Sequence, residues 1–594
     1  MGRQATCSEG SHWEWQAPQR RDRGVFAIRL ARSRLALAAI GVTFVAAASM
    51  SAAHAQQVAP SQVTPQTLQP VPAPGAPPAI ELPAAAGLTP PENAEKLFVQ
   101  VGRVEVEGTF PGFDRETAAT VDALSGKRVA VARLYDVAND LEHAYAAAGY
   151  FLARVVIPPQ KLGDGATVHL TVIDGVIERI ETKDIPERQR SIVMARMAGI
   201  VGVHHLTLKE MERRLLLVAD LPGLQVRSTL AAGATAGATQ LVLQGTQTYA
   251  TGTFGFDNRL PASLGTSEIS ASATLNSAIG LGEQTYFSID TSPDVTYPRL
   301  RVLGGGFVLP IGDDGFTINP EYTTSIARPI PTAGAPATQG DFQRMSLRAS
   351  YPLIRSRVEN LTLQGLLEWE DETLNPIGFT TDLYHDDYGA GRLRAIYSFF
   401  PEPDLPVQVS GTISHGLAGR SATTALPLSR NGADPTFTSA YIEANLQYPL
   451  PASLVLAVSG RAQTSFGDPL MLSEQFALDG VTALSAFANG TFSVDQGATL
   501  RAELRRPFTL PIEGQTVAFA PYVFGAGGWG EFVMPTAVEQ RDIGAGATGI
   551  GMRTDVGIFG IAGGTLIFEF ARKFSDVPAV ADGYRANISL NLRF

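Results

Sequence analysis

Apolar and polar side chains alternate along the last eleven residues of the chain, 584–594. Side chains in a strand point alternately to its two faces, so one face of this segment is apolar and the other is polar. A tilted strand of about 9 to 11 residues crosses a bilayer, and an aromatic end suits the membrane interface. The pattern predicts a membrane strand, with the last strand of a soluble sandwich as the alternative. The apolar face consists of Tyr584, Ala586, Ile588, Leu590, Leu592 and Phe594.

The same alternation recurs from residue 247 to the C-terminus, in segments of roughly ten residues separated by polar or Pro/Gly-rich loops. In one segment Leu500 and Leu504 alternate with the charged residues Arg501, Glu503 and Arg505. An arginine facing lipid at mid-membrane costs about 2 to 4 kcal/mol, so the charged face must line a wet lumen. Eleven segments precede Gly467 and five follow Val494. We therefore predict a membrane all-β fold, a barrel of about sixteen strands over 247–594 with both ends in the periplasm.

Helical periodicity occurs only between the N-terminal region and this barrel, in two similar units at 97–181 and 182–246. The first unit reads as strand, helices, strand, turn, strand, and the same order returns after Asp174-Gly175. A capping box at Thr207–Glu210 starts the last helix of the second unit. Each unit is predicted to pack helices on one face of a small sheet with an open edge. Two tandem copies indicate an array of binding modules.

The first 96 residues contain a targeting segment and a linker. Arginines 29, 32 and 34 precede an apolar run at 35–48, and Ala53-His54-Ala55 places small residues where a signal peptidase reads. We expect a signal peptide at 1–55, because the apolar run is shorter than the roughly 20 residues of a membrane helix. Residues 56–96 are rich in Pro and Ala and predict an extended linker. No later stretch is long and apolar enough for a membrane-spanning helix.

Charge and cysteine content narrow the class of partner. Removal of residues 1–55 takes away seven arginines and three acids, so the formal charge falls from −11 to −15. Nucleic acid is therefore not an expected partner. The single cysteine, Cys7, leaves with the signal peptide, so the mature chain has no thiol for disulfides or metal sites. This suits a protein exported through an oxidising periplasm.

Long stretches of the mature chain resemble the outer-membrane transporters of two-partner secretion, the haemolysin secretion/activation family. The runs at 149–180 and 211–243 look like the family's two periplasmic POTRA domains, and 254–284 and 350–363 resemble its barrel hairpins. The resemblance implies an outer-membrane barrel with periplasmic POTRA domains, which secretes a large, unfolded exoprotein. Its expected partners are this client, outer-membrane lipid and periplasmic chaperones.

The family also carries a long loop inside the pore, whose tip has a Val-Arg-Gly-Tyr/Phe motif. Here the matching residues are Leu484, Ser485, Ala486 and Phe487. In such proteins the arginine pairs with the aspartate of a Phe-x-Asp-x-Gly strand motif, which here reads Phe524, Ala526 and Gly528. The family's N-terminal plug helix has no clear equivalent in the Pro-rich linker.

Both members of that ion pair are thus absent together. Loss of one member would leave an uncompensated charge, whereas loss of both can be nearly neutral. We therefore expect packing, with Phe487 as the anchor, to hold the loop in place of the ion pair. Ala526→Asp alone should destabilise the resting loop, and Ser485→Arg with Ala526→Asp should be tolerated.

Other functions find weaker support in the sequence. A barrel assembly factor has a similar architecture and stays the main alternative, while a passive porin would need no periplasmic modules. The Gly544–Gly549 stretch matches GxGxxG, but a dinucleotide site needs a following helix and this stretch lies in the barrel. Asp382, His385, Asp386 and Asp387 are expected in a solvated loop rather than around a metal. We predict no catalytic residue, no metal and no cofactor.

Overall fold

The computed structural model describes residues 5–8, 12–15, 58–70, 80–81, 89–235, 237–331, 336–512, 515–537, 539–556 and 563–594. The expected signal peptide, 1–55, lies outside these ranges except for β1 (Ala5–Ser8) and β2 (His12–Trp15), which pair with each other. Within the described ranges, none of the helices has the length and apolar character needed to cross a membrane.

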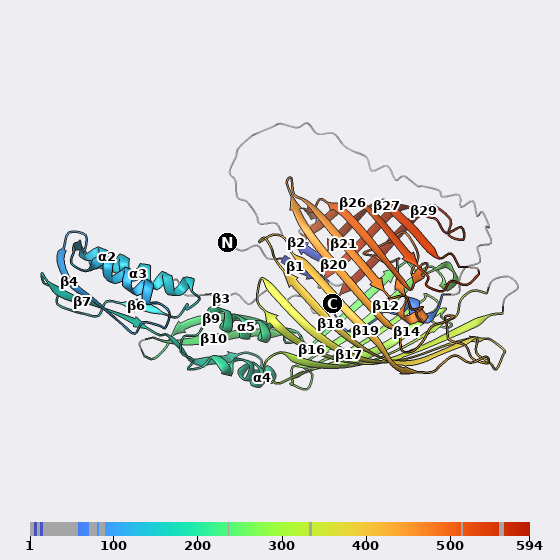
Figure 1. Cartoon of the computed structure of the whole chain (residues 1–594), viewed down its shortest axis with the longest axis horizontal. Helices are drawn as coiled ribbons and strands as arrows, with labels where there is room; N and C mark the ends of the chain where they lie inside the picture. The colour runs from blue at the N-terminus through green and yellow to red at the C-terminus, as the bar shows by residue number, and fades with distance from the viewer. Residues whose placement is uncertain are drawn as a thin grey trace, which may run out of the picture.

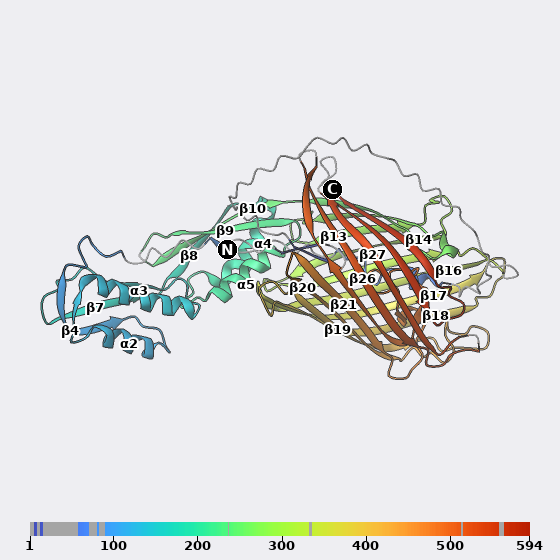
Figure 2. The same cartoon turned by 90° about the horizontal axis from the view of Figure 1, so that it is seen from above.

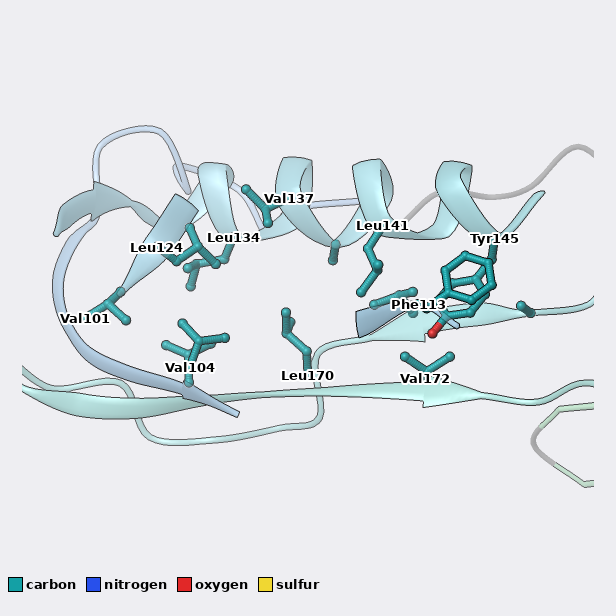
Figure 3. Close-up of a cluster of buried hydrophobic side chains, with 14 of the residues drawn as sticks. Val101, Val104, Phe113, Leu124, Leu134, Val137, Leu141, Tyr145, Leu170 and Val172 are labelled. Atoms are coloured by element: carbon teal, nitrogen blue, oxygen red, sulfur yellow. The ribbon is translucent and has the colours of Figure 1, made fainter. Parts of the chain in front are cut away.

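The first α+β unit packs two helices on one face of a four-stranded sheet. Its elements are β4 (Phe98–Glu107), α2 (Asp114–Leu124), β5 (Arg128–Ala130), α3 (Val131–Ala147), β6 (Arg154–Val156) and β7 (Ala166–Ile173), with sheet order β5-β4-β7-β6. Leu134, Leu141 and Tyr145 point from α3 toward Leu170 and Val172 on β7, as Figure 3 shows, and all five are buried. The helical spacing of these residues directs one apolar stripe onto the sheet.

The second unit repeats this arrangement next to the barrel. It contains β8 (Val176–Asp184), α4 (Glu187–Met197), the short helix η1 (Ala198–Ile200), α5 (Leu208–Ala219), β9 (Leu224–Ala232) and β10 (Ala238–Gln247). Thr207 caps α5, since its hydroxyl accepts from the Glu210 N–H at 3.2 Å and the Glu210 carboxylate accepts from the Thr207 N–H at 2.9 Å.

The boundary between the two units differs from the predicted one at 181/182. Strand β8 crosses that position and pairs in parallel with β10 of the second unit. The two units therefore meet before Val176. The local pattern identified the strand, but only its pairing partner assigns it to a sheet.

The C-terminal region is a closed antiparallel barrel, which confirms the predicted fold class. β24 and β25 pair with the same neighbour, β26, so they are two parts of one strand and the barrel has sixteen strands. Its strands are β11 (Ala250–Asp257), β12 (Glu268–Asn276), β13 (Gln284–Thr291), β14 (Leu300–Ile311), β15 (Phe316–Ala327), β16 (Thr338–Arg355), β17 (Glu359–Pro376), β18 (Tyr384–Phe399), β19 (Val407–Gly419), β20 (Thr438–Leu450), β21 (Leu454–Thr464), β24 (Gln496–Arg505), β25 (Phe508–Ile512), β26 (Gln515–Glu531), β27 (Asp542–Val556), β28 (Gly563–Ser575) and β29 (Gly583–Arg593).

The barrel closes where its last strand, β29, pairs with its first, β11. The Phe594 N–H and carbonyl exchange hydrogen bonds with Gly252, at 3.1 and 2.7 Å. Tyr584 is exposed on the outer face, stacked on Phe570, while Leu590 and Leu592 pair with Phe256 and Phe254 in the seam. The alternating C-terminal segment therefore lies at the closure of the barrel.

The two α+β units form an arm at one end of the barrel (Figures 1 and 2). The second unit docks on two barrel turns through ion pairs of opposite polarity. Arg213 of α5 pairs with Asp314 at 3.2 Å, whereas Asp220, which caps α5, pairs with Arg355 of the barrel at 2.7 Å. Arg214–Asp313 and Glu212–Arg357 repeat the two polarities at 3.4 and 3.3 Å. The resemblance implies that the arm lies in the periplasm. In that orientation, the barrel end next to the arm faces the periplasm and the loops at the other end are extracellular.

Candidate functional site

The segment between β21 and β24, residues 465–495, folds back into the barrel lumen. It is called the pore loop below. Lumen-facing side chains of β21 hold its backbone, since Arg461 donates to the carbonyls of Ala477 and Asp479 at 3.1 and 2.9 Å. Ser459 donates to the Thr482 carbonyl at 2.7 Å. The strand that precedes the pore loop therefore also binds its backbone in the lumen.

The pore loop has internal structure that closes its two arms on each other. β22 (Phe476–Ala477) pairs with β23 (Ser493–Val494), and the short helix η3 (Leu472–Glu474) precedes them. The Asp479 carboxylate accepts N–H bonds from Gly490 and Phe492 at 3.2 and 3.0 Å. These bonds satisfy backbone donors that would otherwise be buried without partners.

The tip of the pore loop is fully packed. Leu484, Ala486 and Phe487 are each at most 1% exposed. Phe487 packs on Phe492 with ring centroids 4.9 Å apart, and the Lys573 ammonium lies over the Phe487 ring, 5.2 Å from its centroid. Aromatic contacts of this kind add about 0.5 to 1.5 kcal/mol beyond burial of their area. The tip is thus held by apolar contact on several sides.

The three strand-motif residues meet the tip from β26. Phe524 belongs to the buried cluster around Ala486, and a Cβ atom at Gly528 would lie 3.3 Å from the Leu484 side chain. Ala526 packs at the edge of the cluster that contains Leu484 and Phe487. The structure therefore brings the two motifs together.

Ser485 lies at the centre of a buried polar network. Arg501 of β24 donates to its hydroxyl at 2.7 Å, and this hydroxyl donates to Glu569 of β28 at 2.7 Å. Arg501 also pairs with Glu569 at 2.5 Å, and the amide of Asn587 donates to the Ser485 carbonyl at 2.7 Å. Arg501 is 1% exposed, so these charge-assisted bonds are formed away from water.

A second set of contacts orients Arg501 within the wall. Its Nε donates to Glu503 at 2.6 Å, and its guanidinium lies 3.8 Å from the ring centroid of Phe524. Tyr522 donates to Glu569 at 2.8 Å. These wall residues therefore fix the position of the guanidinium independently of its contact with the loop.

The loop is thus held by a charged group as well as by packing, which differs from the prediction of packing alone. The arginine comes from the barrel wall and reaches the serine that stands at the motif's arginine position. Sequence reasoning missed Arg501, Glu569 and Asn587 as site residues. A signal was present, because Arg501 was already placed on the lumen face by its alternation with Leu500 and Leu504.

A second piece of the chain lies inside the barrel, although it was expected to be linker. Residues 58–70, with the short helix α1 (Pro60–Val63), lie against the inner faces of β15–β17. Thr67 and the Leu68 N–H donate to Glu321 at 2.9 and 3.2 Å, and Arg344 donates to the Pro65 carbonyl at 2.6 Å. A four-residue helix that starts at proline has no periodicity to detect, so sequence analysis found no equivalent of a plug.

The described part of the lumen is lined by charged and hydroxyl groups. In the described part of the chain, no set of three or more His, Cys, Asp or Glu side chains could hold a metal ion. Three of the four residues expected in a solvated loop, His385, Asp386 and Asp387, lie in strand β18, while Asp382 precedes it. His385 contacts Asp371 at 3.1 Å. Gly544–Gly549 lies in β27, without a following helix.

Comparison with known proteins agrees with this architecture. Residues 99–175 match the family model of the ShlB-type POTRA domain, and residues 237–552 match that of the haemolysin secretion/activation protein ShlB/FhaC/HecB. The outer membrane transporter CdiB of Escherichia coli is 26% identical over 484 residues, which cover 76% of each chain. The heme/hemopexin transporter protein HuxB of Haemophilus influenzae is 23% identical over 179 residues, 30% of this chain and 32% of that one.

Solved structures of similar fold include two CdiB proteins. CdiB from Escherichia coli superposes with a TM-score of 0.65 at 21% identity, over 91% of this chain and 94% of that one. CdiB from Acinetobacter baumannii gives a TM-score of 0.58 at 16% identity, over 86% and 95%. The relatives are named transporters and the matching family model is that of a secretion/activation protein, which favours translocation over the assembly of other barrels. The second family model spans more than half of this chain. The chain therefore belongs to the haemolysin secretion/activation family and is an outer-membrane transporter of two-partner secretion, with POTRA domains in the periplasm and a secreted exoprotein as partner.

Proposed function

We propose that the client is a large, unfolded, β-rich exoprotein that passes through the barrel lumen to the cell surface. The observation that supports this most is the content of the lumen. It is lined by charged and hydroxyl groups and occupied by two segments of the chain itself, the pore loop and residues 58–70. Both are held by contacts that can be exchanged for contacts with a passing polypeptide, unlike the fixed wall of a passive pore.

Client capture is proposed to occur on the POTRA sheets. The first sheet ends in β5 and β6, which have three residues each. The second ends in β8 and in the two-residue strand β3 (Ile80–Glu81). An extended client segment can add to such an edge, where main-chain hydrogen bonds give affinity and side-chain pockets give selectivity. Periplasmic chaperones would keep the client extended, and outer-membrane lipid would solvate the barrel wall.

The energy for transport is proposed to come from folding of the client outside the cell. The sequence contains no GxxxxGK[ST] phosphate loop, and the periplasm lacks ATP. We propose that the protein performs no catalysis. Barrel assembly is kept as the second candidate, because the architecture of POTRA units and barrel would also suit it.

The first experiment compares wild type with a clean deletion of the gene, by mass spectrometry of culture supernatant and outer membrane. We expect the loss of one large secreted or surface protein, which would identify the client. A broad depletion of outer-membrane barrels would instead support an assembly factor. No change in either fraction would contradict transport of a client.

A further inference from the structure

Three extracellular segments meet above the lumen: the loop 420–437, the base of the pore loop and the loop 532–541. Gly432 lies at their junction with φ of +77°, and a Cβ atom there would be 2.7 Å from the Met534 sulfur and 3.3 Å from the Pro469 ring. Glycine suits this position, because side chains rarely adopt this backbone conformation and a Cβ atom would crowd Met534. Chain segments that are more than 30 residues apart are therefore in direct contact at the mouth of the barrel.

Arg430 joins the three segments through its guanidinium. Nη1 pairs with Glu539 at 2.5 Å, Nη2 pairs with Asp495 at 3.5 Å, and the group lies 4.8 Å from the ring centroid of Phe532. The side chain is only 4% exposed. A guanidinium in this position loses most of its hydration, so its partners must replace the bonds to water.

Asp495 joins the same segments from the other side of the ion pair. It is fully buried, and one carboxylate oxygen accepts from the Leu470 N–H at 3.0 Å and from the Gln475 amide at 3.2 Å. The other oxygen accepts from the Val533 N–H at 2.9 Å. One carboxylate therefore connects both ends of the pore loop with the loop 532–541.

The loop 420–437 is also fixed to the wall and to the pore loop beside Arg430. The Ser429 N–H donates to Asp386 of β18 at 2.8 Å, and the Ser429 hydroxyl accepts from the Leu472 N–H at 3.1 Å. None of these groups belongs to the network around Ser485. Opening the mouth therefore requires breaking a second set of polar contacts.

We infer that Arg430 and Asp495 are positioning residues that hold the extracellular exit closed, independently of the contact between Ser485 and Arg501. A buried ion pair adds little net stability, because desolvation offsets the attraction. Its value here is geometric, since three segments dock on one charge pair and separate together when the pair is broken. The exit is then closed at rest and opens when a client displaces any one of the three segments.

The test measures ion conductance of the purified full-length protein in planar lipid bilayers. Arg430→Gln should raise the frequency of channel openings several-fold over wild type. Arg541→Gln is the matched control, because Arg541 pairs with Glu531 beside the same loop but is 63% exposed. This control should behave as wild type, since exposed ion pairs contribute little.

Heat-modifiable migration on gels shows in parallel whether each variant is a folded barrel. If Arg430→Gln does not fold, Asp495→Asn replaces it, because this change breaks the same ion pair while the Arg430 guanidinium keeps Glu539 as a partner. More frequent openings in a folded variant support the proposal that Arg430 and Asp495 hold the exit closed. Wild-type openings in a folded variant would overturn it, as would an equal increase in Arg541→Gln.

Discussion

Arg501 is the residue on which the position of the pore loop depends. Its guanidinium contacts the loop hydroxyl of Ser485, the carboxylates of Glu503 and Glu569 and the ring of Phe524, while it is almost inaccessible to water. Such a network is stabilising only when every member is satisfied. If one member is lost, the remaining members stay buried without a partner and their desolvation free energy is no longer offset.

Arg501→Gln is expected to destabilise the folded barrel by about 3 to 5 kcal/mol, because it leaves the buried carboxylate of Glu569 without its cation, whereas Glu503 keeps Arg505. The measurement is the temperature at which the purified barrel loses its heat-modifiable form. Arg541→Gln serves as control, since an exposed ion pair is worth about 0 to 1 kcal/mol. Equal temperatures for the two variants would contradict the assignment.

Phe487→Ala should loosen the tip of the loop by about 3 to 5 kcal/mol, because it empties a site that is 1% exposed. Faster cleavage within the pore loop by an added protease would report the change. Phe466→Ala provides a matched control in the same loop, since Phe466 is 64% exposed. A cleavage rate that is the same in both variants would show that Phe487 is not an anchor.

At the scale of elements, the pore loop depends on strands that are distant in sequence. β24 supplies Arg501, β26 supplies Phe524 and Gly528, and β28 supplies Glu569. Ala526 is the cross-strand partner of Arg501 in the β24–β26 ladder, so both side chains face the lumen beside the loop tip. A charge introduced at position 526 or 485 therefore meets the existing network.

Ser485→Arg alone should reduce secretion, because it removes a bridging hydroxyl and brings a second guanidinium to Arg501. Ala526→Asp alone should also reduce secretion, since it adds a third carboxylate near Glu503 and Glu569. The double variant should recover, because the new charges pair with each other. Secretion assays of the two single variants and the double variant form a double-mutant cycle. Equal secretion from all three would refute the coupling.

At the scale of the whole molecule, the second POTRA domain is held on the barrel by reciprocal charges. Arg355 forms a two-pronged pair with Asp220, at 2.7 and 2.9 Å, and the polarity is opposite in the Arg213–Asp314 pair. Reciprocal polarity disfavours a shifted docking, because any displacement brings like charges together. The arm is therefore aligned with the entrance of the lumen.

Arg355→Glu should broaden the distribution of distances between spin labels on α5 and on the barrel, and Asp220→Arg added to it should narrow the distribution again. Because residues 8–594 contain no cysteine, labels can be placed at chosen sites in both units and in the barrel. Electron paramagnetic resonance gives the distances. A swap variant as broad as the single variant would show that these charges do not set the docking.

The same interface should respond to acid. Burial acts to raise the pKa of Asp314, but the hydroxyl of Tyr351 and the charges of Arg213 and Arg214 outweigh it and hold this pKa below the usual 3.8. A carboxyl group whose pKa is lowered in the docked state stabilises docking at pH values above its usual pKa. This stabilisation is lost as the pH falls through the lowered pKa. Label distances should therefore stay constant between about pH 7 and pH 5 and broaden only below about pH 4. Broadening near neutral pH would contradict this.

Strand periodicity by itself determined the barrel of about sixteen strands and its polar lumen, because burial on one face of a strand imposes a two-residue period that short segments reveal. The helical period in turn indicated the two α+β units. Only the tertiary structure decided which groups meet. Arg501 lies 16 positions and Glu569 84 positions from Ser485, and residues 58–70 reach the lumen from beyond both POTRA domains. These meetings depend on strand register, barrel closure and the path of a loop without periodicity. A local pattern carries no information on such contacts, since it records the face of a side chain and not its partner.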